Sequence, residues 1–264
     1  MLYRYEQRPN PMWGSRLAIS TLTDDFQPDP NVSPYLLESR RQGLEDPRIF
    51  EHEGRLLVSY CSAYRQHLME LDGDFNVVRD QELSLPDLHK DCEKNWTYFS
   101  TGQDIYMVYS WQPTHRVYKL IDDGKRWSFT FVREQQVKFP DWRWGQIRGG
   151  TNPVLWGDRY WSFFHSSYFH PFLDLFDNRI YTAGYVVFEK EYPFKITHYS
   201  SEPILWPVFE DWGGLTGCAV VFPCGAERGP RGWNIGFGHH DYRCKILQPD
   251  DRELKLLERC VPNV

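Results

Sequence analysis

The chain has 264 residues, of which 17% are aromatic, and it carries a formal net charge of −6 at pH 7. This charge argues against a nucleic-acid partner, because phosphate backbones bind clustered lysines and arginines. Aromatic rings in excess of what a core needs commonly stack on sugar rings or bases. The composition therefore favours a carbohydrate as the ligand.

Cysteine usage and the length of the apolar runs bear on the compartment. Residues 1–8 contain no apolar stretch of the kind a secretory signal needs, and no run approaches the roughly 18 apolar residues that cross a bilayer. The six cysteines are scattered without a C-x-x-C pair, so we expect free thiols and no metal site. We expect a cytoplasmic protein without membrane contact, cofactor or metal. A homo-oligomer is compatible with the sequence.

The apolar runs are short, rich in Val, Ile, Tyr, Phe and Trp, and separated by Gly, Asp, Asn and Pro, which is typical of strands and turns. One layout recurs with a period of roughly 50 residues, as propeller blades do. It consists of a polar opening, a short strand, a turn, a strongly apolar strand and a polar cluster. Its four copies occupy residues 45–62, 93–111, 148–167 and 213–241.

A fifth, degenerate copy is expected from the two ends of the chain. The strand patterns Arg16–Ile19 and Lys245–Leu247 would join in one sheet and close the array. Further strand patterns, such as residues 67–71 and 181–189, lie between the copies and give four strands to each repeat. The sequence predicts an all-β fold, a single five-bladed β-propeller over residues 1–264, with a β-sandwich as the alternative.

The polar openings of the four copies occupy the same place in each repeat. They read Glu45-Asp46-Pro47-Arg48, Glu93-Lys94-Asn95-Trp96, Arg148-Gly149-Gly150 and Gly213-Gly214. The first strand of each propeller blade lines the central channel. The openings are therefore predicted to converge on one axial site.

In the first opening, Asp46 is expected to hold sugar hydroxyls, while the guanidinium of Arg48 holds an anion. A turn closed by an Asp–Arg ion pair, with Pro47 fixing the backbone before the strand, is the alternative interpretation.

The second opening carries the candidate general acid. Glycosyl transfer needs a proton donor at the glycosidic oxygen, and Glu93 is the first candidate for it, with Asp91 the second. Lys94 can tune nearby carboxylates, and Trp96 offers a stacking face. Together with Asn95 these residues are expected to contact the substrate. A solvated loop is the alternative.

The later copies supply candidate anion and sugar ligands. Arg148 beside two glycines suits phosphate, although a turn with a surface arginine is the alternative. His165 ends the apolar strand of the third copy, and His240 and Asp241 end that of the fourth. Because these clusters lie at equivalent places, we expect at least one of them to bind the ligand. Their spacing does not match a zinc site.

Taken in order, these motifs resemble the β-mannoside phosphorylase family, glycoside hydrolase family 130. The resemblance rests on residues 45–49, 93–96, 148–153, 164–167 and 238–241, and it spans residues 40–247. It implies a five-bladed propeller that cleaves or forms a β-mannosidic bond with inversion, using inorganic phosphate and no metal.

The resemblance also assigns roles to individual residues. The general acid of the family is an aspartate directly before a lysine, and Glu93 stands in that position. By the same matching, Arg48, Arg148 and His165 are expected to bind phosphate. The expected function is a cytoplasmic phosphorylase of a short β-mannoside. An inverting hydrolase or a mannosyltransferase on the same fold, or a non-catalytic carbohydrate-binding propeller, are the alternatives.

Overall fold

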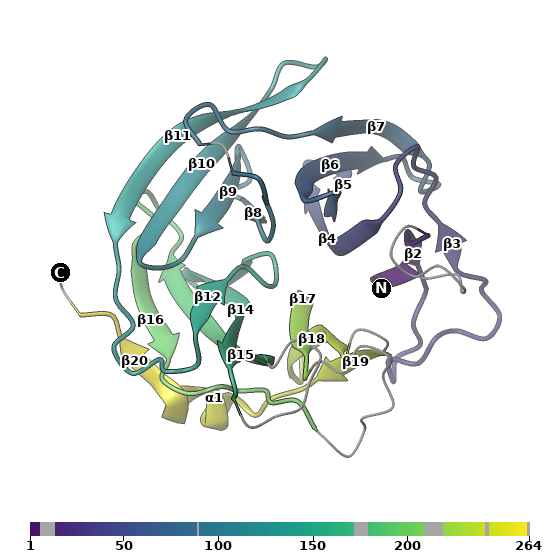
Figure 1. Ribbon diagram of the computed structural model, residues 1–264. Coiled ribbons are helices and arrows are strands. Elements are labelled where there is room, and N and C mark those ends of the chain that lie inside the picture. Colours follow the sequence, from purple (N-terminus) through teal and green to yellow (C-terminus); the bar gives the residue numbers. More distant parts are fainter. Residues whose placement is uncertain (6–13, 89, 172–178, 209–218, 241–242, 263–264) are drawn as a thin grey trace. The chain divides into compact units, whose positions relative to one another are not determined.

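The computed structural model describes residues 1–5, 14–88, 90–171, 179–208, 219–240 and 243–262. Their strands form five sheets, whose elements are labelled in Figure 1. The contacts divide the chain into two compact units, Met1–Met107 with Tyr118–Phe131, and Val108–Val117 with Val132–Val264. In the part of the chain that the structure describes, no helix has the length and hydropathy that a membrane span requires.

The first three sheets follow one another along the chain. The amino-terminal sheet contains β1 (Leu2–Tyr5), β2 (Arg16–Ile19) and β3 (Tyr35–Leu36). The next has the order β4 (Leu44–His52), β5 (Arg55–Ser62), β6 (Arg65–Leu71) and β7 (Val77–Glu82). The third contains β8 (Thr97–Ser100), β9 (Ile105–Ser110), β10 (Thr114–Asp122) and β11 (Trp127–Gln136). The hairpins expected in the first two copies are confirmed.

The remaining two sheets belong to the second unit. The larger contains β12 (Gln146–Arg148), β13 (Val154–Trp156), β14 (Arg159–Phe169), β15 (Arg179–Glu189), β16 (Ile196–Ser200) and the late strand β20 (Glu258–Cys260). The smaller contains β17 (Val221–Gly229), β18 (Gly232–His239) and β19 (Arg243–Leu247). A short helix, α1 (Asp251–Leu257), follows it.

The expectation that both chain ends share one sheet is wrong. Strand β2 pairs with β1 and β3, whereas β19 pairs with β18. The amino-terminal sheet therefore forms without any carboxy-terminal strand. The signal for β3 is weak, because this strand has only two residues and follows a segment with three prolines, which interrupt strand patterns.

Each unit has its own apolar core. In the first unit, side chains of the amino-terminal sheet pack on those of the β4–β7 sheet, among them Leu17, Val58 and Met69, which are fully buried. In the second, Phe163 and Trp233 belong to a cluster that joins the two sheets with α1. Burial of these faces removes apolar surface from water, which is the main stabilising term of such folds.

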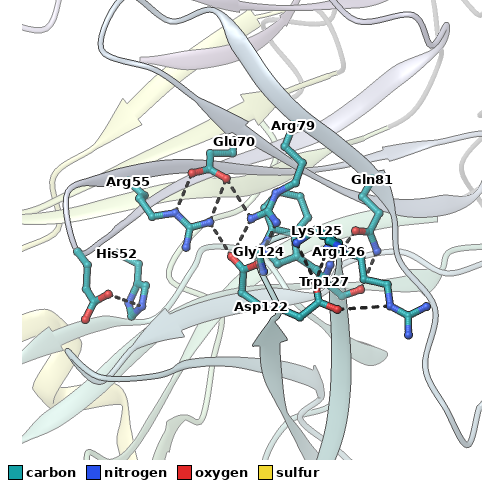
Figure 2. A network of polar contacts seen from close by, with 12 residues as sticks. His52, Arg55, Glu70, Arg79, Gln81, Asp122, Gly124, Lys125, Arg126 and Trp127 are labelled. Carbon is teal, nitrogen blue, oxygen red and sulfur yellow. Dashed lines mark hydrogen bonds and ion pairs between the residues drawn. The ribbon is translucent and has the colours of Figure 1, made fainter.

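A network of charged side chains joins the β4–β7 sheet to the β10–β11 hairpin (Figure 2). Asp122 accepts hydrogen bonds from Arg55 at 2.8 Å and from both terminal nitrogens of Arg79 at 2.9 and 2.7 Å. Glu70 neutralises the same two arginines from the sheet side, at 2.8–3.0 Å. The guanidinium of Arg79 lies 3.5 Å from the ring centroid of Trp127. Each charge is therefore paired on more than one side.

The hydrogen bonds from Arg79, which outweigh partial burial, hold the pKa of Asp122 well below its usual range. A carboxyl with a depressed pKa stabilises the folded state above its unfolded pKa of about 4, and this contribution is lost as the pH falls further. Asp122 therefore ties the stability of the first unit to the ionisation of one carboxyl.

We predict that Asp122→Asn lowers the free energy of unfolding by about 1–3 kcal/mol at pH 7, because two arginines lose a charged acceptor. The difference from the unmodified protein should shrink as the pH falls from 4 toward 2. Urea unfolding across this pH range measures it. Asp74→Asn is the control, because Asp74 is exposed in the β6–β7 turn of the same sheet. Equal losses in the two variants would contradict the assignment.

Candidate active site

The residues expected to form the site fall into two groups, each within one unit. In the first unit they lie where β4 begins and in the segment that leads into β8. In the second unit they lie on β12, β14 and directly after β18. Asp241 and the pair Gly213-Gly214 lie outside the described residues.

A β-bulge shapes the beginning of β4. Glu45 pairs with Cys61 and Arg48 pairs with Ser59, so the segment between them contains one residue more than the facing strand. Asp46 lies in this bulge and has a φ of 52°. Pro47 is tolerated there because proline has no N–H that would be left unpaired. The bulge turns the half-buried Asp46 out of the regular ladder.

Arg48 returns to the ladder after the bulge and is only 1% exposed. Its Nη1 donates to the backbone oxygen of Asp46 at 2.8 Å, and its Nη2 donates to Oδ1 of Asn95 at 3.4 Å. The guanidinium thus connects the bulge to the segment before β8. These contacts hold protein groups together, and a role of Arg48 toward phosphate stays a prediction.

Lys94 is held by carboxylates rather than free to meet a ligand. Its Nζ donates to Oε2 of Glu45 at 2.6 Å and lies 5.2 Å from the ring centroid of Tyr64. Burial alone would lower the pKa of Lys94, but the carboxylates of Asp46 and Glu45 outweigh this effect and raise it above the usual lysine range. Lys94 is therefore a fixed positive charge.

The carboxyl of Glu93 is buried, with 8% of the residue exposed. Its Oε2 accepts a hydrogen bond from Nε1 of Trp96 at 3.2 Å, and its backbone N–H donates to the carbonyl of Tyr64 at 2.8 Å. Trp96 is 1% exposed, and its ring packs against that of Phe129 at an angle of 82°. A ring so buried offers no face to a sugar. Its indole N–H instead holds the carboxyl of Glu93 in place.

Asp91, the second candidate for the acid, is exposed. Glu93 is the candidate that the fold holds in one orientation.

In the second unit, Arg148 and His165 are brought together. They are paired directly across β12 and β14, and cross-strand partners project to the same side of a sheet. Arg148 is exposed, whereas His165 is 1% exposed and its ring centroid lies 4.3 Å from that of Phe222. The pair combines a guanidinium in solvent with a histidine packed beneath it.

The second glycine after Arg148 has a packing role. A Cβ at Gly150 would lie 2.2 Å from the carbonyl oxygen of Phe163. Thr151 then binds Phe163 twice, with its N–H donating to the carbonyl at 2.7 Å and its hydroxyl accepting from the N–H at 3.0 Å. Gly150 is thus required for the close approach of two backbone segments.

His240 is 2% exposed and has a φ of 52°. Its Nε2 lies 3.1 Å from the carbonyl oxygen of Val208, and its Nδ1 accepts from the N–H of Val220 at 3.4 Å. A neutral ring protonated on Nε2 satisfies both contacts. The ring also lies 3.9 Å from that of His239. These contacts fix the backbone after β18, and contact with a sugar stays a prediction.

The sequence motifs do not indicate the roles of two residues of the first unit. Glu45 belongs to the first polar opening, but its ion pair with Lys94 joins two residues that lie 49 positions apart in the chain. Tyr64 follows Ala63 in a two-residue turn. This turn contains neither glycine nor asparagine, the residues that usually indicate a hairpin in a sequence. Among the described residues, no group of three potential ligands is placed to hold a metal.

Comparisons with known proteins address the fold. A Parabacteroides distasonis protein superposes with a TM-score of 0.66 at 17% identity, covering 93% of this chain and 81% of that one. The β-1,2-mannobiose phosphorylase of Listeria innocua, in complex with β-1,2-mannobiose, superposes with a TM-score of 0.64 at 16% identity, covering 92% of this chain and 69% of that one. A glycosyl hydrolase from Bacteroides ovatus superposes with a TM-score of 0.64 at 16% identity, covering 95% of this chain and 80% of that one. The predicted five-bladed β-propeller fold is confirmed, with the five sheets as its blades.

Comparison of the sequence addresses the family. No curated protein matches the chain. A family model described as β-1,4-mannooligosaccharide phosphorylase matches residues 25–248, a range that contains each motif on which the resemblance rests. The chain therefore belongs to glycoside hydrolase family 130 and is a glycoside-active enzyme.

Proposed function

We propose that the protein is an inverting glycoside phosphorylase that cleaves a short β-mannoside with inorganic phosphate. The observation that carries the proposal is the buried carboxyl of Glu93, which the indole N–H of Trp96 holds at 3.2 Å in a chain of this family. The β-mannoside substrate class is supported by the family description and by the phosphorylase from Listeria innocua.

In the proposed reaction, protonated Glu93 donates its proton to the glycosidic oxygen as the bond from that oxygen to the anomeric carbon breaks. A phosphate oxygen attacks the anomeric carbon from the opposite face of the ring. The products are α-mannose 1-phosphate and the released sugar, so the proton ends on the leaving hydroxyl and the phosphate on the mannosyl carbon.

The other predicted residues receive supporting roles in this proposal. Asp46, turned out of the ladder by the bulge, and Asn95, whose amide oxygen faces Arg48, are assigned to sugar hydroxyls. His240 is assigned to the sugar as well. The fixed positive charge of Lys94 lies next to Glu93 in the chain, and its Nζ donates to Oε2 of Glu45.

We assign inorganic phosphate to Arg148 and His165. A guanidinium offers paired N–H groups that match phosphate oxygens, and Arg148 is exposed on β12 directly opposite the imidazole of His165.

The assignment of the acid is tested with Glu93→Gln. This variant keeps the shape of the side chain but carries no transferable proton, so kcat for phosphorolysis of β-1,4-mannobiose should fall about 10²–10⁴-fold. Asp91→Asn is the matched control and should stay within about twofold of the unmodified enzyme. Release of α-mannose 1-phosphate measures both. If sugar release proceeds equally well without phosphate, the protein is a hydrolase.

The phosphate assignment predicts a separate effect. Arg148→Ala should raise the KM for phosphate about tenfold or more, the order expected for loss of a charge-assisted hydrogen bond. The exposed Arg143, five residues earlier, supplies the control Arg143→Ala, which removes the same charge. Initial rates at varied phosphate concentration give both constants. An unchanged KM in Arg148→Ala would move the phosphate site elsewhere.

A further inference from the structure

The turn between β5 and β6 is built from residues that are unfavourable there. Ser62 pairs with Arg65, so Ala63 and Tyr64 form a two-residue turn, and their φ angles are 48° and 62°. Two successive left-handed residues define the type I′ turn, for which asparagine and glycine are preferred because they tolerate positive φ. Backbone strain of this kind is often retained where a side chain serves function.

Burial does not explain why a tyrosine occupies this turn, because Tyr64 is 62% exposed. Its ring rests on the fixed charge of Lys94, with Nζ at 5.2 Å from the centroid. Its carbonyl accepts the backbone N–H of Glu93 at 2.8 Å. Tyr64 is therefore an exposed aromatic side chain in direct contact with the segment that carries the proposed acid.

Arg65 binds the same segment from the neighbouring position. Its Nη1 donates to the carbonyl of Lys90 at 2.8 Å, and its side chain is otherwise exposed. Residues 90–93 are thus attached at both ends to the turn. One guanidinium nitrogen is used for this attachment, and the exposed part of the fork can meet a ligand.

We infer that Tyr64 and Arg65 form the subsite for the sugar that leaves, rather than for the mannosyl group that is transferred. This inference rests on the proposed function, because a general acid protonates the oxygen of the leaving sugar and therefore has that sugar beside it. The ring of Tyr64 stacks on the apolar face of the pyranose, and Arg65 donates to its hydroxyls.

The opposite end of the same sheet supplies an internal comparison. His52 pairs with Arg55, so Glu53 and Gly54 also form a two-residue turn, with φ angles of 51° and 75°. This turn has glycine at its second position, where the β5–β6 turn has Tyr64. A turn of this geometry in the same sheet therefore forms with glycine at its second position, so the turn itself does not require a tyrosine there.

The test uses Tyr64→Gly, which relieves the positive φ and removes the ring. Calorimetry with β-1,4-mannobiose is performed in the Glu93→Gln background, so that no turnover occurs. We expect Tyr64→Gly to weaken binding about tenfold, the order of a lost stacking contact, while the melting temperature stays equal or rises. Glu53→Gly, the matched control, should leave the affinity unchanged. An affinity within twofold of the parent in Tyr64→Gly would overturn the inference.

A second variant tests the guanidinium. Arg65→Ala should weaken mannobiose binding, and Arg65→Lys should recover only part of it, because lysine lacks the planar fork. Unchanged binding in Arg65→Ala would remove this residue from the subsite. The phosphate dependence of the unmodified enzyme is a separate measurement. Mannobiose cleavage without phosphate would overturn the phosphorylase proposal, and the affinities of the Tyr64 variants would still decide the subsite.

Discussion

The ion pair between Glu45 and Lys94, at 2.6 Å, is the contact on which the candidate site of the first unit depends. It joins the beginning of β4 to the segment before β8, two places 49 residues apart in the chain. Burial disfavours the charge of Lys94, and the carboxylates of Asp46 and Glu45 outweigh this effect. Once this pair is formed, Glu93 and Asn95 on either side of Lys94 have restricted positions. The arrangement favours a rigid acid over a mobile one.

Buried polar side chains complete this restriction. Arg48 closes the bulge and reaches Asn95, and Trp96 holds the carboxyl of Glu93 through its indole N–H. Each of these groups lies in the interior and has a polar partner there, as buried polar atoms require. The substrate can therefore meet a site whose supporting hydrogen bonds are already made, which reduces the ordering needed on binding. The same buried side chains thus belong to the core of the first unit and support the candidate acid.

The sequence predicted the blades well because each hairpin carries its own apolar pattern and turn, as in β4–β5 and β8–β9. It failed for the amino-terminal sheet, because the two-residue strand β3 is too short to produce a pattern. The sequence indicated which residues belong to the candidate site, but it did not indicate their burial or their hydrogen-bond partners. Burial of Trp96 and capture of Lys94 by Glu45 are set by contacts between distant segments. Tyr64 could not be identified from the sequence either, because the feature that marks its turn is a positive φ angle, which no residue pattern indicates.

Strand β20 has a consequence for biosynthesis. It pairs with β16, whose residues lie about 60 positions earlier. In the same way, the hydroxyl of Tyr185 on β15 donates to the carbonyl of Leu254 in α1 at 2.6 Å. A nascent chain emerging from the ribosome cannot finish this sheet until residue 260 has left the exit tunnel. Until then the edge of β16 lacks its neighbour, and unpaired edges favour association with other chains. The second unit should thus depend on chaperones during synthesis more than the first, whose residues all precede residue 132.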